Sequence, residues 1–266
     1  MTMPSADGAV FRAQLREVSR NRWVWAYGAA LALITEALLR MGGTGPRALT
    51  SLLNVVLLVV PLVTTVFGVV YWHAAREFTE LLLAQPIGRG RLWRGLYLGL
   101  ALPLAATFAI GLSVPLVLHR AIDASSIGLL VAFVGTGVAL TATFAALALW
   151  IAVRTDDRLR ALGTALGIWF GITVVYDALI VWATTALTAW PLERALLAAM
   201  FANPVDLART VLVMQVDGAA LMGYTGAVLT RLLGGATGAT VLLIAMTLWI
   251  ALPALAARRA FLRRDF

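Results

Sequence analysis

Long apolar stretches alternate with short, arginine-rich polar stretches along the chain. About 20 apolar residues in a helix cross the ~30 Å hydrocarbon core of a bilayer, because each residue adds ~1.5 Å. The pattern therefore predicts an all-α polytopic membrane protein with six transmembrane helices. The predicted spans are 22–39, 52–74, 96–118, 126–153, 161–187 and 236–257.

The residues before the first predicted span have the pattern of a helix that lies in the membrane interface. The apolar face of this helix would carry Val10, Phe11, Leu15 and Val18. The opposite face would carry Arg12, Arg16 and Arg20. We therefore expect an interfacial amphipathic helix in residues 1–21. A solvated beginning of the first span is the alternative.

The connection 188–235 is long and apolar throughout. Within it, Asn203, Pro204 and Asp206 are typical of a helix start: asparagine caps, proline suits the first position, and a carboxylate favours the positive end of the helix dipole. We expect two or three short helices here. They are too apolar to stand alone in water, so they should dip into the membrane or dock on another protein.

Composition and charge agree with a membrane protein and suggest its orientation. The chain is 61% hydrophobic and 13% charged, whereas a soluble domain has roughly half and about a quarter. All 21 basic residues are arginine, and they gather at the ends of apolar runs, so nucleic-acid binding is not expected. A cytoplasmic N-terminus places 15 arginines inside and 6 outside. This bias predicts that both termini are cytoplasmic, with a cytoplasmic tail at 258–266.

Few residues could carry chemistry. The chain has no cysteine, and its two histidines, His73 and His119, are predicted to lie at opposite membrane faces, so we expect no metal site. The sequence Gly111-Leu112-Ser113-Val114 has no histidine after it to act as a base, which disfavours a membrane-embedded protease. Because the chain lacks lysine, it cannot form a Walker A motif, and ATP would have to be bound by another subunit. We therefore expect a non-catalytic subunit with no cofactor of its own.

Asp177 is the one ionisable residue deep in a predicted span. It lies ten residues before the outer end of that span, about 15 Å along a helix and thus near mid-bilayer. A charge there costs at least ~2.5 kcal/mol, so the side chain should be protonated, paired or in a polar cavity. We predict that Asp177, Tyr176 and Asn54 line a translocation path or gate. A protonated Asp177 bonded to a neighbouring helix is the alternative.

Gly163, Gly167 and Gly171 recur every four residues on one face of the same span. Such a stripe of small residues allows another helix to approach closely in lipid. We favour packing within the six-helix bundle, with a contact to a second copy as the alternative.

The predicted cytoplasmic stretch 76–95 contains REFTELLLAQPIGRGR. Its first part fits a short amphipathic helix, with Leu81 among the apolar residues and Glu77 among the polar ones. Pro86 would end the helix, and the glycines Gly88 and Gly90 would turn the chain into the third span. An ordinary interfacial loop is the alternative.

The run ELLLAQPIGRGRLWRGLYLG resembles the first cytoplasmic loop of ABC-2-type permeases, the coupling helix that docks on the ATPase subunit. The resemblance implies a permease domain at 22–257 in the bacterial inner membrane, a homodimer with a second copy, and a separate ABC ATPase that binds ATP and Mg. It implies ATPase contacts at Arg76, Glu77, Glu80, Gln85, Pro86 and Arg89.

The stretches REFTELLLAQPI, NPVDLART and ALMGYTGAV are similar to permeases of the transporter for nitrous-oxide reductase maturation. That similarity implies a periplasmic β-helical partner and a role in copper-sulfur centre assembly. The chain departs from these permeases in lacking a Gly-Thr-Leu before its leucines and in having Leu96 where lysine is frequent. A generic exporter of a drug, lipid or other small molecule and an assembly subunit without transport are the alternatives. We predict an outer gate or partner contact at Asn203, Asp206, Tyr224 and Thr225.

Overall fold

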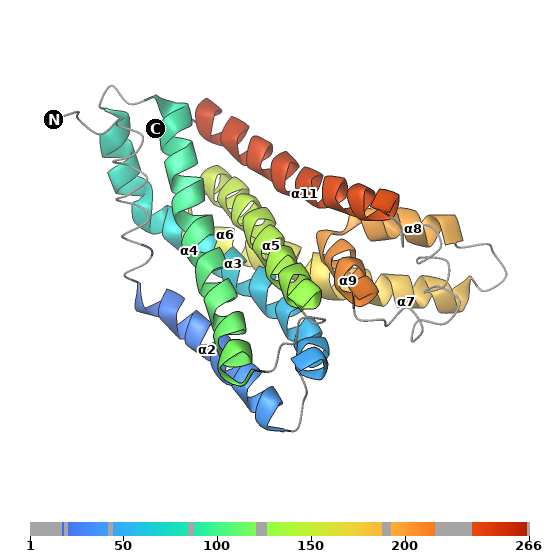
Figure 1. Ribbon diagram of the computed structural model, residues 1–266. Helices are drawn as coiled ribbons and strands as arrows, with labels where there is room; N and C mark the ends of the chain where they lie inside the picture. Colours follow the sequence, from blue (N-terminus) through green and yellow to red (C-terminus); the bar gives the residue numbers. More distant parts are fainter. Residues whose placement is uncertain are drawn as a thin grey trace.

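The computed structural model describes residue 18 and residues 21–41, 45–84, 88–120, 127–187, 193–215 and 236–264. These residues form helices and no strand, which confirms the all-α fold (Figure 1). The helices are α2 (Arg22–Arg40), α3 (Gly45–Leu83), α4 (Arg89–Leu118), α5 (Ile127–Arg154), α6 (Arg158–Phe170), the π-helix η2 (Gly171–Val175), α7 (Tyr176–Ala186), α8 (Glu193–Ala202), α9 (Pro204–Gln215) and α11 (Ala236–Arg263).

Within the described residues, five helical stretches are long and apolar enough to cross a membrane. The pair α8 and α9, bent by 108°, brings the number to six if it counts as one span. These stretches confirm a multi-pass membrane protein. The first predicted span forms α2 but is not among the five, because its 19 residues include Glu36 and charged residues at both ends. Its role as a span remains a prediction.

The spans differ in how far the rest of the chain covers them. Buried residues make up 50% of the most apolar stretch in α3, 56% in α4 and 44% in α5, but only 11% in α6–α7 and 17% in α11. Helices α3, α4 and α5 therefore form the centre of the bundle. Figure 1 shows α2 along α4 on one side and α11 along α5 on the other.

Small residues allow the central helices to approach closely. A Cβ atom added at Gly111 would lie 2.6 Å from the carbonyl oxygen of Gly28, so α2 and α4 meet at their backbones. A Cβ atom added at Gly68 would lie 2.5 Å from the Cβ atom of Ala148, where α3 meets α5. Close backbone contact is how membrane helices associate without hydrophobic drive. Gly111 thus has a packing role in the Gly-Leu-Ser-Val sequence.

The prediction of a separate short helix at the start of 76–95 is wrong. Helix α3 continues without a break to Leu83, because no proline occurs between Pro61 and Pro86. Helix α4 already begins at Arg89, with Gly88 at its N-cap. The expected loop therefore consists of the ends of two long helices joined by residues 84–88.

Other predicted boundaries also change or stay untested. Helix α11 runs to Arg263, so most of the expected tail is helical and continuous with the last span. The expected interfacial helix at 1–21 falls almost wholly outside the described residues, as do Gln85, Pro86, Tyr224 and Thr225.

Candidate functional site

The bent pair α8–α9 is organised by Asn203, which is only 2% exposed. The Oδ1 atom of Asn203 accepts a hydrogen bond of 2.8 Å from the backbone N–H of Val205. Pro204 is the first residue of α9, and Asp206 lies in its first turn. This confirms the predicted helix start, in which a side-chain oxygen satisfies a backbone donor that has no partner inside the helix.

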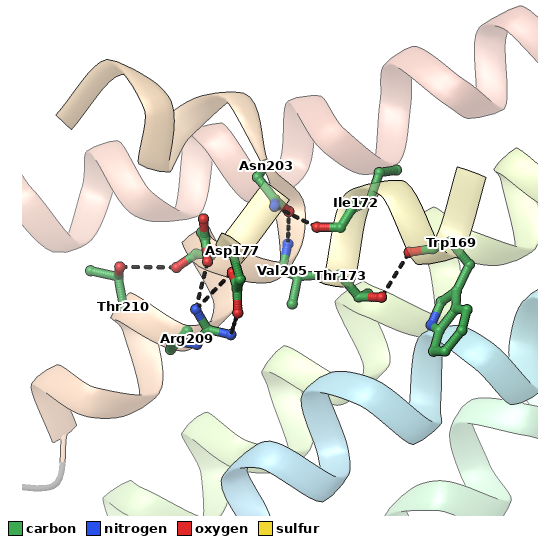
Figure 2. A network of polar contacts seen from close by, with 9 residues as sticks. Trp169, Ile172, Thr173, Asp177, Asn203, Val205, Arg209 and Thr210 are labelled. Atoms are coloured by element: carbon green, nitrogen blue, oxygen red, sulfur yellow. Dashed lines mark hydrogen bonds and ion pairs between the residues drawn. The ribbon is translucent and has the colours of Figure 1, made fainter. Parts of the chain in front are cut away.

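Asn203 also binds the π-helix in the middle of the neighbouring span. Residues Gly171–Val175 form η2 between α6 and α7, and a π-helical turn interrupts the regular hydrogen bonds of an α-helix. The Nδ2 atom of Asn203 donates to the carbonyl oxygen of Ile172 at 2.8 Å. Figure 2 shows Asn203 pointing toward Ile172. One buried amide therefore begins α9 and holds it against η2.

Asp177 forms an ion pair with Arg209 of α9 (Figure 2). The Nη2 atom of Arg209 lies 2.6 Å from Oδ2 of Asp177, and its Nη1 atom donates to Oδ1 of Asp177 at 3.1 Å and to Oδ1 of Asp206 at 2.8 Å. The side chain of Asp177 is 34% exposed, that of Arg209 is 30% exposed, and that of Asp206 is 15% exposed. Of the states that the sequence left open for Asp177, the structure shows the paired one. We call Asp177, Asn203, Asp206 and Arg209 the hairpin cluster.

Two further bonds hold the bent pair in place. The hydroxyl of Tyr176 donates to the carbonyl oxygen of Ala199 at 2.7 Å. Nε1 of Trp249 in α11 donates to the carbonyl oxygen of Phe201 at 3.0 Å. Tyr176 thus joins α7 to α8, next to the hairpin cluster. Asn54 lies exposed on α3, and among the described residues no hydrogen bond joins it to this cluster.

A second group of charges lies where the helices predicted to end in the cytoplasm meet. Nη1 of Arg76 lies 2.9 Å from Oδ1 of Asp156, between α5 and α6, and Arg264 pairs with the same carboxylate. Arg76 also pairs with Glu80 one turn further along α3. Nη1 of Arg89 donates to the carbonyl oxygens of residues 262 and 264 at 3.2 Å each. We call Arg76, Asp156 and Arg264 the helix-end cluster.

This cluster brings together the ends of α3, α5 and α11, and Arg89 joins the start of α4 to the end of α11. The described parts of the predicted cytoplasmic segments 76–95, 154–160 and 258–266 therefore share one end of the bundle. The side of the membrane on which that end lies remains a prediction.

The predicted ATPase contacts differ in their exposure. Glu77, Glu80 and Arg89 are exposed, and Arg76 is half-buried. The exposed face of α3 near Glu77 also carries Phe78 at 46% and Leu81 at 69% exposure. Apolar side chains on a helix end in water are suited to contact a partner.

The histidines bind neighbouring groups at opposite ends of the bundle. His73 lies 2.9 Å from the carbonyl oxygen of Val69 and 3.2 Å from that of Thr155. Nε2 of His119 lies 2.7 Å from Oε2 of Glu36, which joins α4 to α2. No group of three or more histidine or carboxylate residues in the described part of the chain could hold a metal ion.

The predicted packing of the glycine stripe inside the bundle is wrong for the part of the chain that the structure describes. A Cβ atom at Gly163, Gly167 or Gly171 would have no atom within 4 Å. The stripe points away from the other helices, because α6–α7 lies at the edge of the bundle and is covered on one side only.

Reasoning from the sequence missed three of the charged partners. Arg209 is the only cation in NPVDLART and lies three residues after Asp206. Its pairing with a carboxylate inside a span could therefore have been predicted from the sequence. Asp156 and Arg264 lie more than 100 residues apart, and no local spacing indicates that they meet.

These features define an all-α, multi-pass membrane subunit with polar contacts concentrated at its helix ends and at a bent helix pair. No protein-family model matches the chain. The chain is 28% identical over 272 aligned residues to the "Probable ABC transporter permease protein NosY" of Pseudomonas aeruginosa, which covers 96% of this chain and 97% of the relative. It is 25% identical, with the same coverage, to the protein of that name from Stutzerimonas stutzeri. The similarity confirms the predicted resemblance to these permeases and supports a permease subunit of an ABC transporter.

Proposed function

We propose that this chain couples ATP hydrolysis by a separate ABC ATPase subunit to movement of the bent pair α8–α9. The observation that carries the proposal is that one span joins the two charged clusters. Asp156 lies two residues before α6, and Asp177 lies in α7 of the same span. Residues 158 to 177 extend about 29 Å at the helical rise. A displacement at the helix-end cluster therefore has a continuous helical path, through η2, to the hairpin cluster.

The ATPase would dock at the tip formed by the end of α3 and the start of α4. Its contact surface would be the exposed face with Glu77, Phe78 and Leu81. Next to this face, the half-buried Arg76 binds Asp156, and the exposed Arg89 binds the end of α11. Their role would be to transmit the load, since each already has partners within the chain.

The hairpin cluster would act as a gate. Rigid-body movement of α8–α9 away from α7 must break the pairing of Arg209 with Asp177 and the bond from Asn203 to the π-helix. Since Asn203 is buried, it would position the gate, and contacts with an outer partner would fall to exposed residues nearby. Asp206, whose side chain is 15% exposed, stays a candidate for that contact. So do Tyr224 and Thr225, which lie outside the described residues.

The finer role that we propose is nitrous-oxide reductase maturation in the bacterial inner membrane, with a periplasmic β-helical partner. Similarity at REFTELLLAQPI and NPVDLART supports it. The transporter would contain two copies of this chain. The open glycine stripe on α6–α7 supports that proposal, because it offers a second copy a face that no described helix of the same chain covers.

The test is co-purification in mild detergent and ATPase activity with Glu77 and Leu81 both changed to alanine. These residues are exposed, so the bundle should keep its fold. The matched control is Met41→Ala, an 83% exposed residue at the other end of the molecule. Loss of the ATPase from the double variant alone is expected. Recovery of this chain without an ATPase, or equal recovery with the double variant, would overturn the docking proposal.

A further inference from the structure

A cavity of about 570 Å³ lies between α5, α9 and α11, and none of its lining residues belongs to either cluster. This volume is within the ~300–1,000 Å³ that ligand pockets usually have. Its walls are the face of α5 from Gly128 to Ala139, the end of α9 from Val211 to Gln215, and α11 from Ala239 to Met246. In Figure 1, α5, α9 and α11 lie side by side at this end of the bundle.

The cavity exists because the α5 face is made of small residues that none of the described helices covers. Gly128, Ala132, Gly135 and Ala139 are three or four residues apart and share one face. A Cβ atom at Gly128 or Gly135 would meet no atom within 4 Å. On the opposite face, Gly137 is covered by the ring of Phe108, as is usual for a glycine between membrane helices. The same helix thus uses one glycine for packing and leaves two beside an open space.

The lining is mostly apolar, with Thr136 and Gln215 as its polar residues, and most of it lies on α5 and α11, which are long and apolar enough to cross a membrane. Residues 128 to 139 extend about 16 Å at the helical rise, roughly half of the ~30 Å hydrocarbon core. Val131 and Leu243 on the walls are 63% and 66% exposed, so the cavity opens sideways between α5 and α11. Where α5 and α11 cross the hydrocarbon core, the medium around such an opening is lipid acyl chains, and inside the cavity water would find hydrogen-bonding side chains at Thr136 and Gln215 alone among the lining residues.

We propose that this cavity binds one acyl chain of a membrane phospholipid. Its elongated lining along α5 suits a linear hydrocarbon, and its small residues provide the room that a bulky side chain would remove. Unlike lipid that slides over a smooth helix face, a chain in this cavity is contacted by three helices. The proposal does not depend on the ATPase or on the cargo.

The experiment uses the protein in phosphatidylcholine vesicles that contain a trace of phosphatidylcholine with a photoreactive diazirine on its acyl chain. After illumination, mass spectrometry locates the labelled residues. Labelling is expected within 128–139 and 239–246. In Gly135→Phe the labelling of these residues should fall by about ten-fold, the lower end of what a mis-sized apolar pocket imposes.

Gly163→Phe is the matched control, because it places the same side chain at another open helical glycine outside the cavity. It should leave the labelling of 128–139 unchanged. An unlabelled cavity in the unaltered protein would overturn the proposal, since it would mean that another occupant fills the space. Equal labelling in Gly135→Phe would overturn it too.

A second measurement covers the case in which Gly135→Phe does not assemble. Native mass spectrometry of the unaltered protein should find phospholipid that stays bound at collision energies that strip the surrounding lipid. Release of all phospholipid together would contradict a held acyl chain.

Discussion

The two charged clusters are built from similar groups but lie in different surroundings. The helix-end cluster places one carboxylate, that of Asp156, between two arginines, and this carboxylate is 77% exposed. The hairpin cluster places one arginine between two carboxylates, and Asp206 there is 15% exposed. The first lies at the ends of helices, and the second lies inside a span and against a bent pair.

The difference in surroundings decides what each cluster contributes. In water, an ion pair gains little and is screened by salt, whereas in a medium of low dielectric the same charges interact strongly and each is costly when left alone. Removing one member of the hairpin cluster should therefore affect folding, while removing one of the helix-end cluster should mainly affect how the helix ends move together.

The largest effect is expected for Arg209→Ala, which leaves Asp177 and Asp206 without their shared cation. Breaking a buried pair costs ~3–5 kcal/mol, and the partial exposure here lowers our expectation to about 2–3 kcal/mol. Thermal unfolding of the purified protein in detergent would measure the loss. A variant with Asp177→Leu, Asp206→Leu and Arg209→Met should recover most of the stability, because no unpaired charge remains.

The triple variant also separates stability from gating. If the cluster forms a gate, the triple variant should fold but lose the coupling between ATP hydrolysis and the movement of α8–α9. Full function in the triple variant would show that the cluster is only structural.

A smaller loss, about 1–2 kcal/mol, is expected for Asn203→Ala, which removes both the helix cap and the donor to Ile172. Asn203→Ser keeps a capping oxygen but has no amide to reach the π-helix, so it should recover about half of the loss. Thermal unfolding distinguishes the two contributions. Identical values for both variants would show that the cap contributes nothing and that the π-helix bond accounts for the effect.

Local patterns predicted five of the six spans and the start of α9 well. Apolar length located the helices, and Asn203, Pro204 and Asp206 begin a helix through contacts within four residues. The end of α3 was misplaced because a charged, amphipathic stretch reads as a separate interfacial element even where nothing breaks the helix. The side chains of Arg76 and Glu80 simply continue the helix surface beyond the apolar part.

The contacts between distant segments could not be read in this way. Asp177 was recognised as a group in need of a partner, but the choice of Arg209 depends on the bend at Asn203, which turns α9 back toward α7. Whether the glycine stripe contacts another helix depends on which face of α6–α7 the bundle covers. The spacing of the glycines in the sequence is the same in both cases, so it cannot distinguish them.

The smallest effect on stability is expected for Asp156→Ala. Arg264 would keep its bond to the carbonyl oxygen of Val153 and its position over the ring of Trp72, and Arg76 would keep Glu80. The loss should be about 0.2–1 kcal/mol and should vanish as salt rises, since the shared carboxylate of Asp156 is 77% exposed. Unfolding of Asp156→Ala and Arg209→Ala at low and high sodium chloride tests this directly. A loss in Asp156→Ala that equals that of Arg209→Ala and persists at high salt would show that the helix ends are as shielded from solvent as the span, and the contrast between the two clusters would then be wrong.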